Sequence, residues 1–145
     1  QKTSRTPLII HAPGVSQSGG RCKRPVSLVD LYPTLIDLCG LPDRDDLGGR
    51  SIVPLVRTPE TEWPYPAVIT HSTFWYGSNH AVRSERYHYI HYSDGGEELY
   101  DMSNDPHQWH NLANNEKLLA TKTKLKEWLP KTNAPHFRPD APKVK

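Results

Sequence analysis

The sequence has little of what a self-sufficient globular domain usually contains. Only 35% of its 145 residues are hydrophobic and the mean hydropathy is -0.71, while 14 residues are proline and 9 are glycine. A chain of this length would ordinarily form one domain with a substantial core. The shortage of apolar residues instead predicts a loop-rich chain that is short of core.

Other common features are also missing. No apolar run approaches the roughly 20 residues that a transmembrane helix needs, and Gln1 opens directly onto polar residues without a secretory signal. The formal net charge of +2 is too small to indicate a nucleic-acid-binding protein. We therefore expect neither a membrane nor a nucleic acid as partner.

Cysteine is scarce, with only Cys22 and Cys39 present. Two cysteines make neither a disulfide framework nor a metal knuckle. Cys39 falls in an apolar helical run, which favours a buried and inert thiol. Cys22 lies in a polar loop, and the sequence leaves its state open.

The first part of the chain contains half of an α/β unit. Thr6 to His11 is a short apolar run without alternation, which predicts a buried strand of a parallel sheet. After a loop, apolar residues recur at helical spacing from Leu28 to Leu38. Ser27 and Asp30 form a capping pattern at the start of this helix, and Gly40 with Pro42 ends it. A parallel strand needs neighbours that this chain does not supply, so we expect a truncated unit.

The second part predicts an antiparallel sheet. Four runs are rich in β-branched and aromatic residues, and Asp94-Gly95 supplies a hairpin turn. Asp105 suits an N-cap and Pro106 the first helical position, with Gln108 able to reach back to Asp105. A further helix with an apolar stripe is expected before Pro130. The expected strands are 67–73, 79–83, 87–92 and 98–102, and the stripe is Leu118, Leu119, Leu125, Trp128 and Leu129.

The predicted fold is thus mixed, α/β followed by α+β. Residues 1–57 are the terminal strand–helix unit of a large α/β domain. Residues 58–135 are a small C-terminal subdomain with a four-stranded antiparallel sheet and a packed C-terminal helix. Residues 136–145 are a Pro- and Lys-rich tail with little to bury.

Several motifs together resemble the C-terminal part of sulfatases, in the alkaline-phosphatase-like superfamily. The run Ala81 to Ile90 matches A-V-R-[ST]-[DE]-R-Y-[RK]-Y-I, and Glu98 to Met102 matches E-L-Y-D-L. Asp105 to Ala113 matches D-P-x-E-x-x-N-L-A, and Gly49 to Leu55 matches G-R-S-L-x-P-L-L. His88 stands where the pattern has a basic residue, and Gln108 where it has Glu. The resemblance covers roughly Arg5 to Pro135 and is nearest to iduronate-2-sulfatase-like enzymes.

The resemblance implies hydrolysis of sulfate esters by a formylglycine nucleophile and a Ca²⁺ ion held by Asp and Asn oxygens. None of these groups maps onto this chain. Cys22-Lys23-Arg24-Pro25 has the letters of the C/S-x-P-x-R motif in the wrong order. We expect no catalytic residue, no metal ligand and no bound cofactor here. The formylglycine and Ca²⁺ belong to a missing N-terminal α/β domain, which is the expected partner.

Three local features resemble binding sites but have simpler structural explanations. His107 and His110 form an H-x-x-H pair that also suits a solvated turn, and Lys143 with Lys145 suits a solvated tail. Asp101, Asn104 and Asp105 resemble part of a Ca²⁺ loop without its full ligand run, which a turn explains as well.

The loop from Thr73 to His80 is a better candidate for contact with substrate. Aromatic faces stack on sugar rings, and amide or imidazole groups hydrogen-bond hydroxyls or sulfate. The substrate-proximal candidates are Trp75, Asn79 and His80, although structural packing is the favoured explanation of this loop. Arg83 in the following strand is expected to form a structural ion pair rather than to contact sulfate.

Two classes of function remain open. The chain is expected to be the C-terminal part of a sulfatase acting on a sulfated glycan, inactive alone, where it completes the fold and helps to shape the substrate pocket. The alternatives are a non-catalytic glycan-binding module, or part of a phosphodiesterase-like relative on the same fold. By resemblance, the location is periplasmic, secreted or lysosomal.

Overall fold

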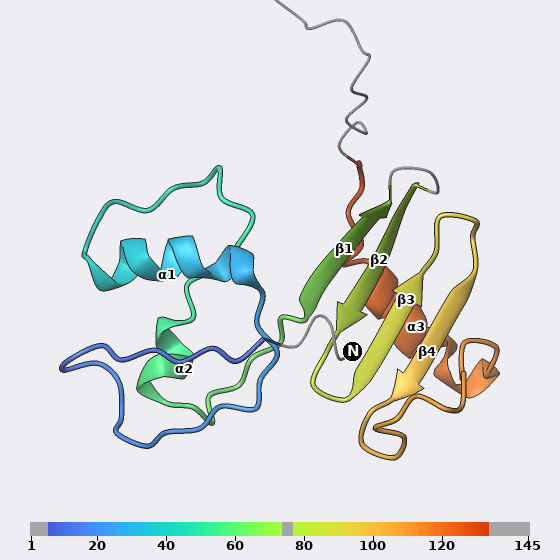
Figure 1. Ribbon diagram of the computed structural model, residues 1–145, viewed down its shortest axis with the longest axis horizontal. Coiled ribbons are helices and arrows are strands. Elements are labelled where there is room, and N and C mark those ends of the chain that lie inside the picture. Colours follow the sequence, from blue (N-terminus) through green and yellow to red (C-terminus); the bar gives the residue numbers. More distant parts are fainter. Residues whose placement is uncertain (1–5, 74–76, 134–145) are drawn as a thin grey trace, which may run out of the picture. The chain divides into compact units, whose positions relative to one another are not determined.

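The chain separates into two compact units, Gln1–Ala67 and Val68–Lys145. The computed structural model describes residues 6–73 and 77–133. The first unit contains short helices and the second contains the sheet (Figure 1). The segment 58–66, which we assigned to the second domain, belongs to the first unit, and the predicted tail 136–145 lies outside the described residues.

The predicted helix of the first unit is present. It opens as the 3-10 turn η1 (Leu28–Asp30) and continues as α1 (Leu31–Leu38). The Asp30 carboxylate accepts the Ser27 backbone N–H at 2.8 Å, so the expected capping partner is in place. Gly40 has φ of 63°, and the N–H groups of Gly40 and Leu41 bond back to Asp37 and Ile36. This left-handed glycine ends the helix as predicted.

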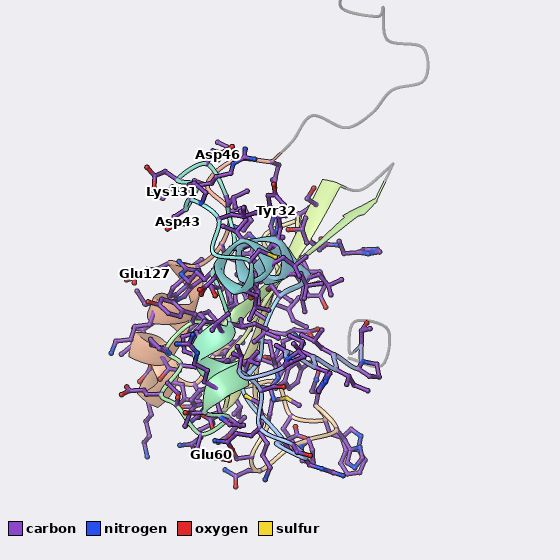
Figure 2. The ribbon with its side chains drawn as sticks, turned by 90° about the vertical axis from the view of Figure 1, so that its left-hand side faces the viewer. Tyr32, Asp43, Asp46, Glu60, Glu127 and Lys131 are labelled. Carbon is purple, nitrogen blue, oxygen red and sulfur yellow. The ribbon has the colours of Figure 1, made fainter. Side chains whose placement is uncertain are left out.

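The backbone of residues 50–52 is hydrogen-bonded to side chains of η1 and α1. The Arg50 backbone N–H donates to Asp30 Oδ1 at 2.9 Å, and the Ile52 N–H donates to Thr34 Oγ1 at 3.0 Å. The short helix α2 (Val53–Arg57) follows at once. Farther along, Arg44 donates to Tyr32 Oη at 3.5 Å and pairs with Asp46 at 2.6 Å; Tyr32 and Asp46 are labelled in Figure 2. These bonds hold the loops of a unit that has few buried apolar side chains.

Two expectations about the first unit are wrong. Residues 6–12 form no strand, and Ile9 is 92% exposed, because residues 6–66 contain no strand that could pair with this segment. Cys39 is exposed rather than buried. It lies one turn after Leu35 and therefore shares the solvent-facing side of the helix.

The second unit is the expected four-stranded sheet, in the order β1-β2-β3-β4. Its strands are β1 (Ala67–Thr73), β2 (Gly77–Arg83), β3 (Tyr87–His91) and β4 (Glu97–Asp101). The central strands pair antiparallel, with Val82 opposite Tyr89 and Tyr89 opposite Leu99. Because partners in register share a face, these three fully buried side chains form one row across the sheet.

A helix covers that row (Figure 1). It opens as η2 (Glu116–Leu118) and continues as α3 (Leu119–Lys126), with Leu125 in the core beside Ala113. Leu118, Trp128 and Leu129 of the predicted stripe pack against this core. Leu119 was wrongly included, since it is 59% exposed. It follows Leu118 directly, and neighbours on a helix point about 100° apart.

The helix expected at Pro106 does not form. Gln108 has φ of 59°, a left-handed conformation that is incompatible with a helical turn at that residue. The Asp105 carboxylate instead accepts the N–H of His110 at 2.8 Å and closes a loop. Across the described ranges, no helix is long and apolar enough to cross a bilayer.

Candidate functional site

The predicted substrate-proximal residues are not brought together on one face. Asn79 and His80 are neighbours in β2, so their side chains leave opposite faces of the sheet. The Asn79 side-chain oxygen accepts the Ser93 N–H at 2.9 Å and ties β2 to the turn after β3. Trp75 lies outside the described residues. Contact between these residues and a substrate therefore stays a prediction.

His80 is buried, with 6% of its surface exposed. Its Nδ1 lies 3.0 Å from Thr70 Oγ1 of β1, while its buried Nε2 has no hydrogen-bond partner among the described residues. A buried ring nitrogen without a partner costs free energy. His80 lies two residues from Val82 and so faces the side of the sheet that α3 covers.

Glu97 carries a carboxylate that is bonded to three other side chains of the second unit. It accepts bonds from Lys122 at 2.8 Å, Lys126 at 2.7 Å and the Tyr89 hydroxyl at 2.7 Å. The two lysines and the tyrosine lower the pKa of Glu97 to about 2. Burial and the bond to Glu97 raise the pKa of Tyr89. The cluster joins α3 to the sheet, and the lowered pKa makes the Glu97 carboxylate a weak base near neutral pH.

Asp101 ends β4 in a second ion pair. Arg86 donates to Asp101 Oδ2 through Nε at 3.1 Å and Nη2 at 2.7 Å, and the Asn104 amide donates to the same oxygen at 2.9 Å. The Arg86 guanidinium lowers the pKa of Asp101. This pair fixes the turn between β2 and β3 to the end of β4, a structural function.

His88 and Gln108, the two departures from the sulfatase pattern, are in contact. His88 is buried on the face of the sheet opposite to Tyr89, and the Gln108 side chain hydrogen-bonds its ring. Burial lowers the pKa of His88, and the charge of Arg83 adds to the effect. Its Nδ1 is buried without a partner among the described residues. The left-handed backbone of Gln108 thus places its side chain against the imidazole.

The predicted ion pair of Arg83 stays a prediction, and the bonds described for Arg83 go to backbone carbonyls. Its guanidinium donates to the carbonyls of Ser84, Glu85 and Tyr87 and so holds the β2–β3 turn. The sequence reasoning missed Asn111, which does the same for the edge of β4. Its side-chain oxygen accepts the N–H groups of Leu99 at 3.0 Å and Ala113 at 2.9 Å, and its amide donates to Glu97 O at 3.2 Å. Its place in the N-L-A motif was the available signal.

The metal-like features have other partners. His107 stacks on Trp109, and His110 lies 3.7 Å from Asp105. Nowhere in residues 6–73 and 77–133 do three or more His, Cys, Asp or Glu side chains gather so as to hold a metal ion. The described residues therefore do not fit the oxygen-rich cage that Ca²⁺ requires.

A family model and known proteins match this chain. A family model described as "N-sulphoglucosamine sulphohydrolase, C-terminal" matches residues 1–134. A protein named "Sulfatase" from Formosa agariphila is 36% identical over 134 residues, which cover 92% of this chain and 25% of that protein. The chain thus spans about a quarter of this relative's length.

Two solved structures resemble the chain. One is described as BT1596, a 2-O GAG sulfatase, with 33% sequence identity and a TM-score of 0.53 over 68% of this chain and 22% of that chain. The other is a phosphonate monoester hydrolase of Agrobacterium radiobacter, with 26% identity and a TM-score of 0.54 over 68% of this chain and 23% of that chain.

Proposed function

This chain belongs to the sulfatase family, in its N-sulphoglucosamine sulphohydrolase C-terminal group, and from that membership we propose that it is the C-terminal part of a sulfatase that hydrolyses sulfate esters on a sulfated glycan. The observation that carries the proposal is the agreement between motif and structure. Residues of the sulfatase-like motifs, Arg83, Arg86, Asp101 and Asn111, all hold the sheet together.

The chain's own chemistry supports a role in completing the fold rather than in catalysis. The Glu97 carboxylate is paired with two lysines, and the described residues offer no metal cage. A formylglycine and Ca²⁺, the groups that sulfatases use to attack and polarise the ester, would be held by other parts of the polypeptide.

The partner in this proposal is a sulfatase α/β domain. The first unit exposes large apolar side chains that a solvated surface does not need. Leu28 is 68% exposed, Val29 62% and Leu35 57%, all along η1 and α1, and Ile9 is 92% exposed. An α/β domain would bury these residues and provide the strands that residues 6–12 lack.

Activity measurements test the proposal. The purified 145-residue chain, incubated with an aryl sulfate and Ca²⁺, should show no turnover above a heat-treated control. The full-length protein should hydrolyse the same ester. Turnover by the isolated chain at stoichiometric levels would contradict the division of roles, and an inactive full-length protein would contradict the function.

The roles of Asn79 and His80 toward the substrate belong to the same proposal. The two side chains leave opposite faces of β2, so we expect only one of them to contact the glycan. His80 is buried on the face that α3 covers, so Asn79 on the opposite face is the better candidate. A contact with the remote sugar can act in the transition state, so its loss lowers kcat/KM on the glycan but not on a small aryl sulfate.

The test compares His80→Ala and Asn79→Ala in the full-length protein on both substrates. One lost hydrogen bond to a charged group corresponds to roughly ten- to a hundredfold in kcat/KM. The melting temperature controls for folding. Equal losses on both substrates would place the residue in folding or chemistry, and no loss on either would leave it structural. Trp75 is tested in the same way.

A second candidate function has one observation in its favour. The phosphonate monoester hydrolase of Agrobacterium radiobacter matches the chain as well as a sulfatase structure does, with TM-scores of 0.54 and 0.53. Assays of the full-length protein with an aryl sulfate and with a phosphonate monoester distinguish the two. A non-catalytic glycan-binding module would hydrolyse neither.

A further inference from the structure

Trp109 is an unusual surface residue. Its side chain lies in the loop between β4 and η2 and is 76% exposed. The His107 ring stacks on it with centroids 4.9 Å apart and planes inclined by 19°. In this stacked arrangement the His107 ring covers part of one indole face and leaves the other face open. An exposed indole does not stabilise the second unit, so its position requires another explanation.

The loop that carries these rings is held in place. Asp105 accepts the N–H of His110 at 2.8 Å, and its own N–H donates to Asp101 O at 2.7 Å. Gln108, between the two rings in sequence, adopts φ of 59° and bonds to buried His88. Bonds on both sides therefore fix the backbone on which Trp109 stands. A pre-ordered loop loses less conformational entropy when a ligand binds.

The surroundings of Trp109 are polar. Trp109 and Leu119 are the exposed large hydrophobic side chains among the described residues of the second unit. The first unit instead exposes several such side chains between Leu28 and Leu41. Ser103, Asn104, His107, His110 and Asn111 are the exposed polar residues around it in the loop. A protein-docking surface is usually a contiguous apolar patch. A single aromatic surface among hydrogen-bonding groups suits a sugar ring, which has an apolar face and a rim of hydroxyls.

We propose that the open face of Trp109, with His107 stacked on its other face, is a carbohydrate-contacting platform that stacks against one sugar ring of a sulfated glycan. The choice of a sulfated glycan rests on the proposed function. The stacking itself rests on the exposure of Trp109, the ring geometry and the fixed loop. The platform contributes binding to a longer glycan and takes no part in bond cleavage.

The experiment measures binding of a heparin-derived hexasaccharide and its desulfated counterpart to the full-length protein. Trp109→Ala should weaken binding about tenfold, whereas Trp109→Phe, which keeps an aromatic face, should stay within about threefold. His107→Ala should weaken binding less than Trp109→Ala. Leu119→Ala is the matched control, because it also removes an exposed apolar side chain of the second unit, and it should bind as the wild type does.

Fluorescence supplies a readout that is independent of activity. The difference between the spectra of wild type and Trp109→Phe isolates Trp109 from the other tryptophans. In the free protein this emission should be quenched freely by acrylamide, and the hexasaccharide should shift it to shorter wavelength and protect it.

Three outcomes would overturn the proposal. Binding that is equal in Trp109→Ala and wild type would remove the platform. Emission already shielded in the free protein would mean that Trp109 packs against protein. Equal binding of the desulfated hexasaccharide would exclude the assignment to a sulfated glycan. Absence of aryl sulfate turnover in the wild type would contradict the sulfatase function alone and leave the binding results unchanged.

Discussion

Glu97 is the residue at which three parts of the second unit meet. It receives the Tyr89 hydroxyl from β3 and two lysine ammonium groups from α3, while its backbone carbonyl accepts the Asn111 amide. Such charge-assisted bonds are stronger than bonds between neutral groups. The side chain is mostly buried, so water screens its interactions less than those of a surface pair.

We expect Glu97→Gln to lower the free energy of unfolding by about 1.5–3 kcal/mol at neutral pH. The pKa of Glu97 lies at about 2, below its ordinary value of 4.5. The stability it contributes is therefore present above pH 4.5 and is lost as the pH falls toward 2. Urea unfolding at pH 7 and pH 3 measures the effect, with exposed Glu116→Gln as control. The same deficit at both pH values would contradict the charge-based explanation.

The folded protein disfavours the charged form of His88, whereas it favours the charged form of Glu97. Burial lowers the pKa of its imidazole from the ordinary 6.5, with Arg83 opposing protonation and Glu98 and Gln108 favouring it. The unfolded chain therefore binds a proton before the folded protein does. Stability falls as the pH decreases below 6.5 toward the lowered value.

We expect His88→Gln to reduce this pH dependence. Melting temperatures between pH 7.5 and 5.5 measure it, and exposed His107→Gln is the matched control. If the wild type and His88→Gln lose the same stability over this range, other groups cause the acid sensitivity.

At the scale of elements, a glycine determines how α1 packs. A Cβ built on Gly49 would lie 2.1 Å from the Val29 carbonyl oxygen, whereas one on Gly48 would meet nothing within 4 Å. Gly49 thus permits the close approach that lets the Arg50 N–H reach Asp30.

Gly49→Ala should therefore lower the free energy of unfolding by roughly 1–3 kcal/mol or more, because the backbone contact leaves no flexible side chain to move aside. Gly48→Ala should cost less than about 1 kcal/mol. Thermal unfolding of both variants in the full-length protein tests the comparison. Equal effects would mean that the segment tolerates displacement from α1.

Local patterns predicted most elements correctly. Runs rich in β-branched and aromatic residues, with an Asp-Gly turn, predicted the four strands, and Ser27, Asp30 and Gly40 marked the ends of the first helix. Local patterns failed where a contact outside the segment determines its structure. The apolar run at residues 6–11 lacks a neighbouring strand, and Asp105 closes a loop through His110 instead of capping a helix.

The candidate site was less accessible to sequence reasoning than the fold. His88 and Gln108 were noted as separate departures from a motif, and only the folded chain shows that one bonds to the other. Asn79 and His80 were grouped because they are adjacent in sequence. Adjacent side chains of a strand point to opposite faces of the sheet, so Asn79 and His80 lie on different faces.

At the scale of the whole molecule, the two units differ in how far they bury their apolar side chains. The second unit buries Val82, Tyr89, Leu99 and Leu125 under its own helix. The first unit buries Ile36, Ile52, Val53 and Leu55 but leaves Leu28 and Val29 of η1 and Tyr32 and Leu35 of α1 exposed. This imbalance explains the low hydrophobic content, since a small unit that packs on a larger domain needs little core of its own.

The isolated chain should therefore self-associate through the first unit. Leu35, which is 57% exposed on α1, is the residue to change. We expect Leu35→Lys to shift the isolated chain toward monomer in sedimentation velocity, because a charge opposes burial of that surface. Leu119→Lys, an equally exposed leucine at 59% in the second unit, should leave the association unchanged.

The same pair of variants has the opposite consequence in the full-length protein. There Leu35 would be buried against the α/β domain, and a lysine at this position should lower the soluble yield and the melting temperature, whereas Leu119→Lys should not. Burying an unpaired charge is among the few single changes that destabilise a protein severely. A monomeric wild-type chain with a sharp cooperative melt, together with a full-length Leu35→Lys variant as stable as the wild type, would mean that this surface faces solvent. The first unit would then be an independent folding unit, and the partner that we propose for it would be wrong.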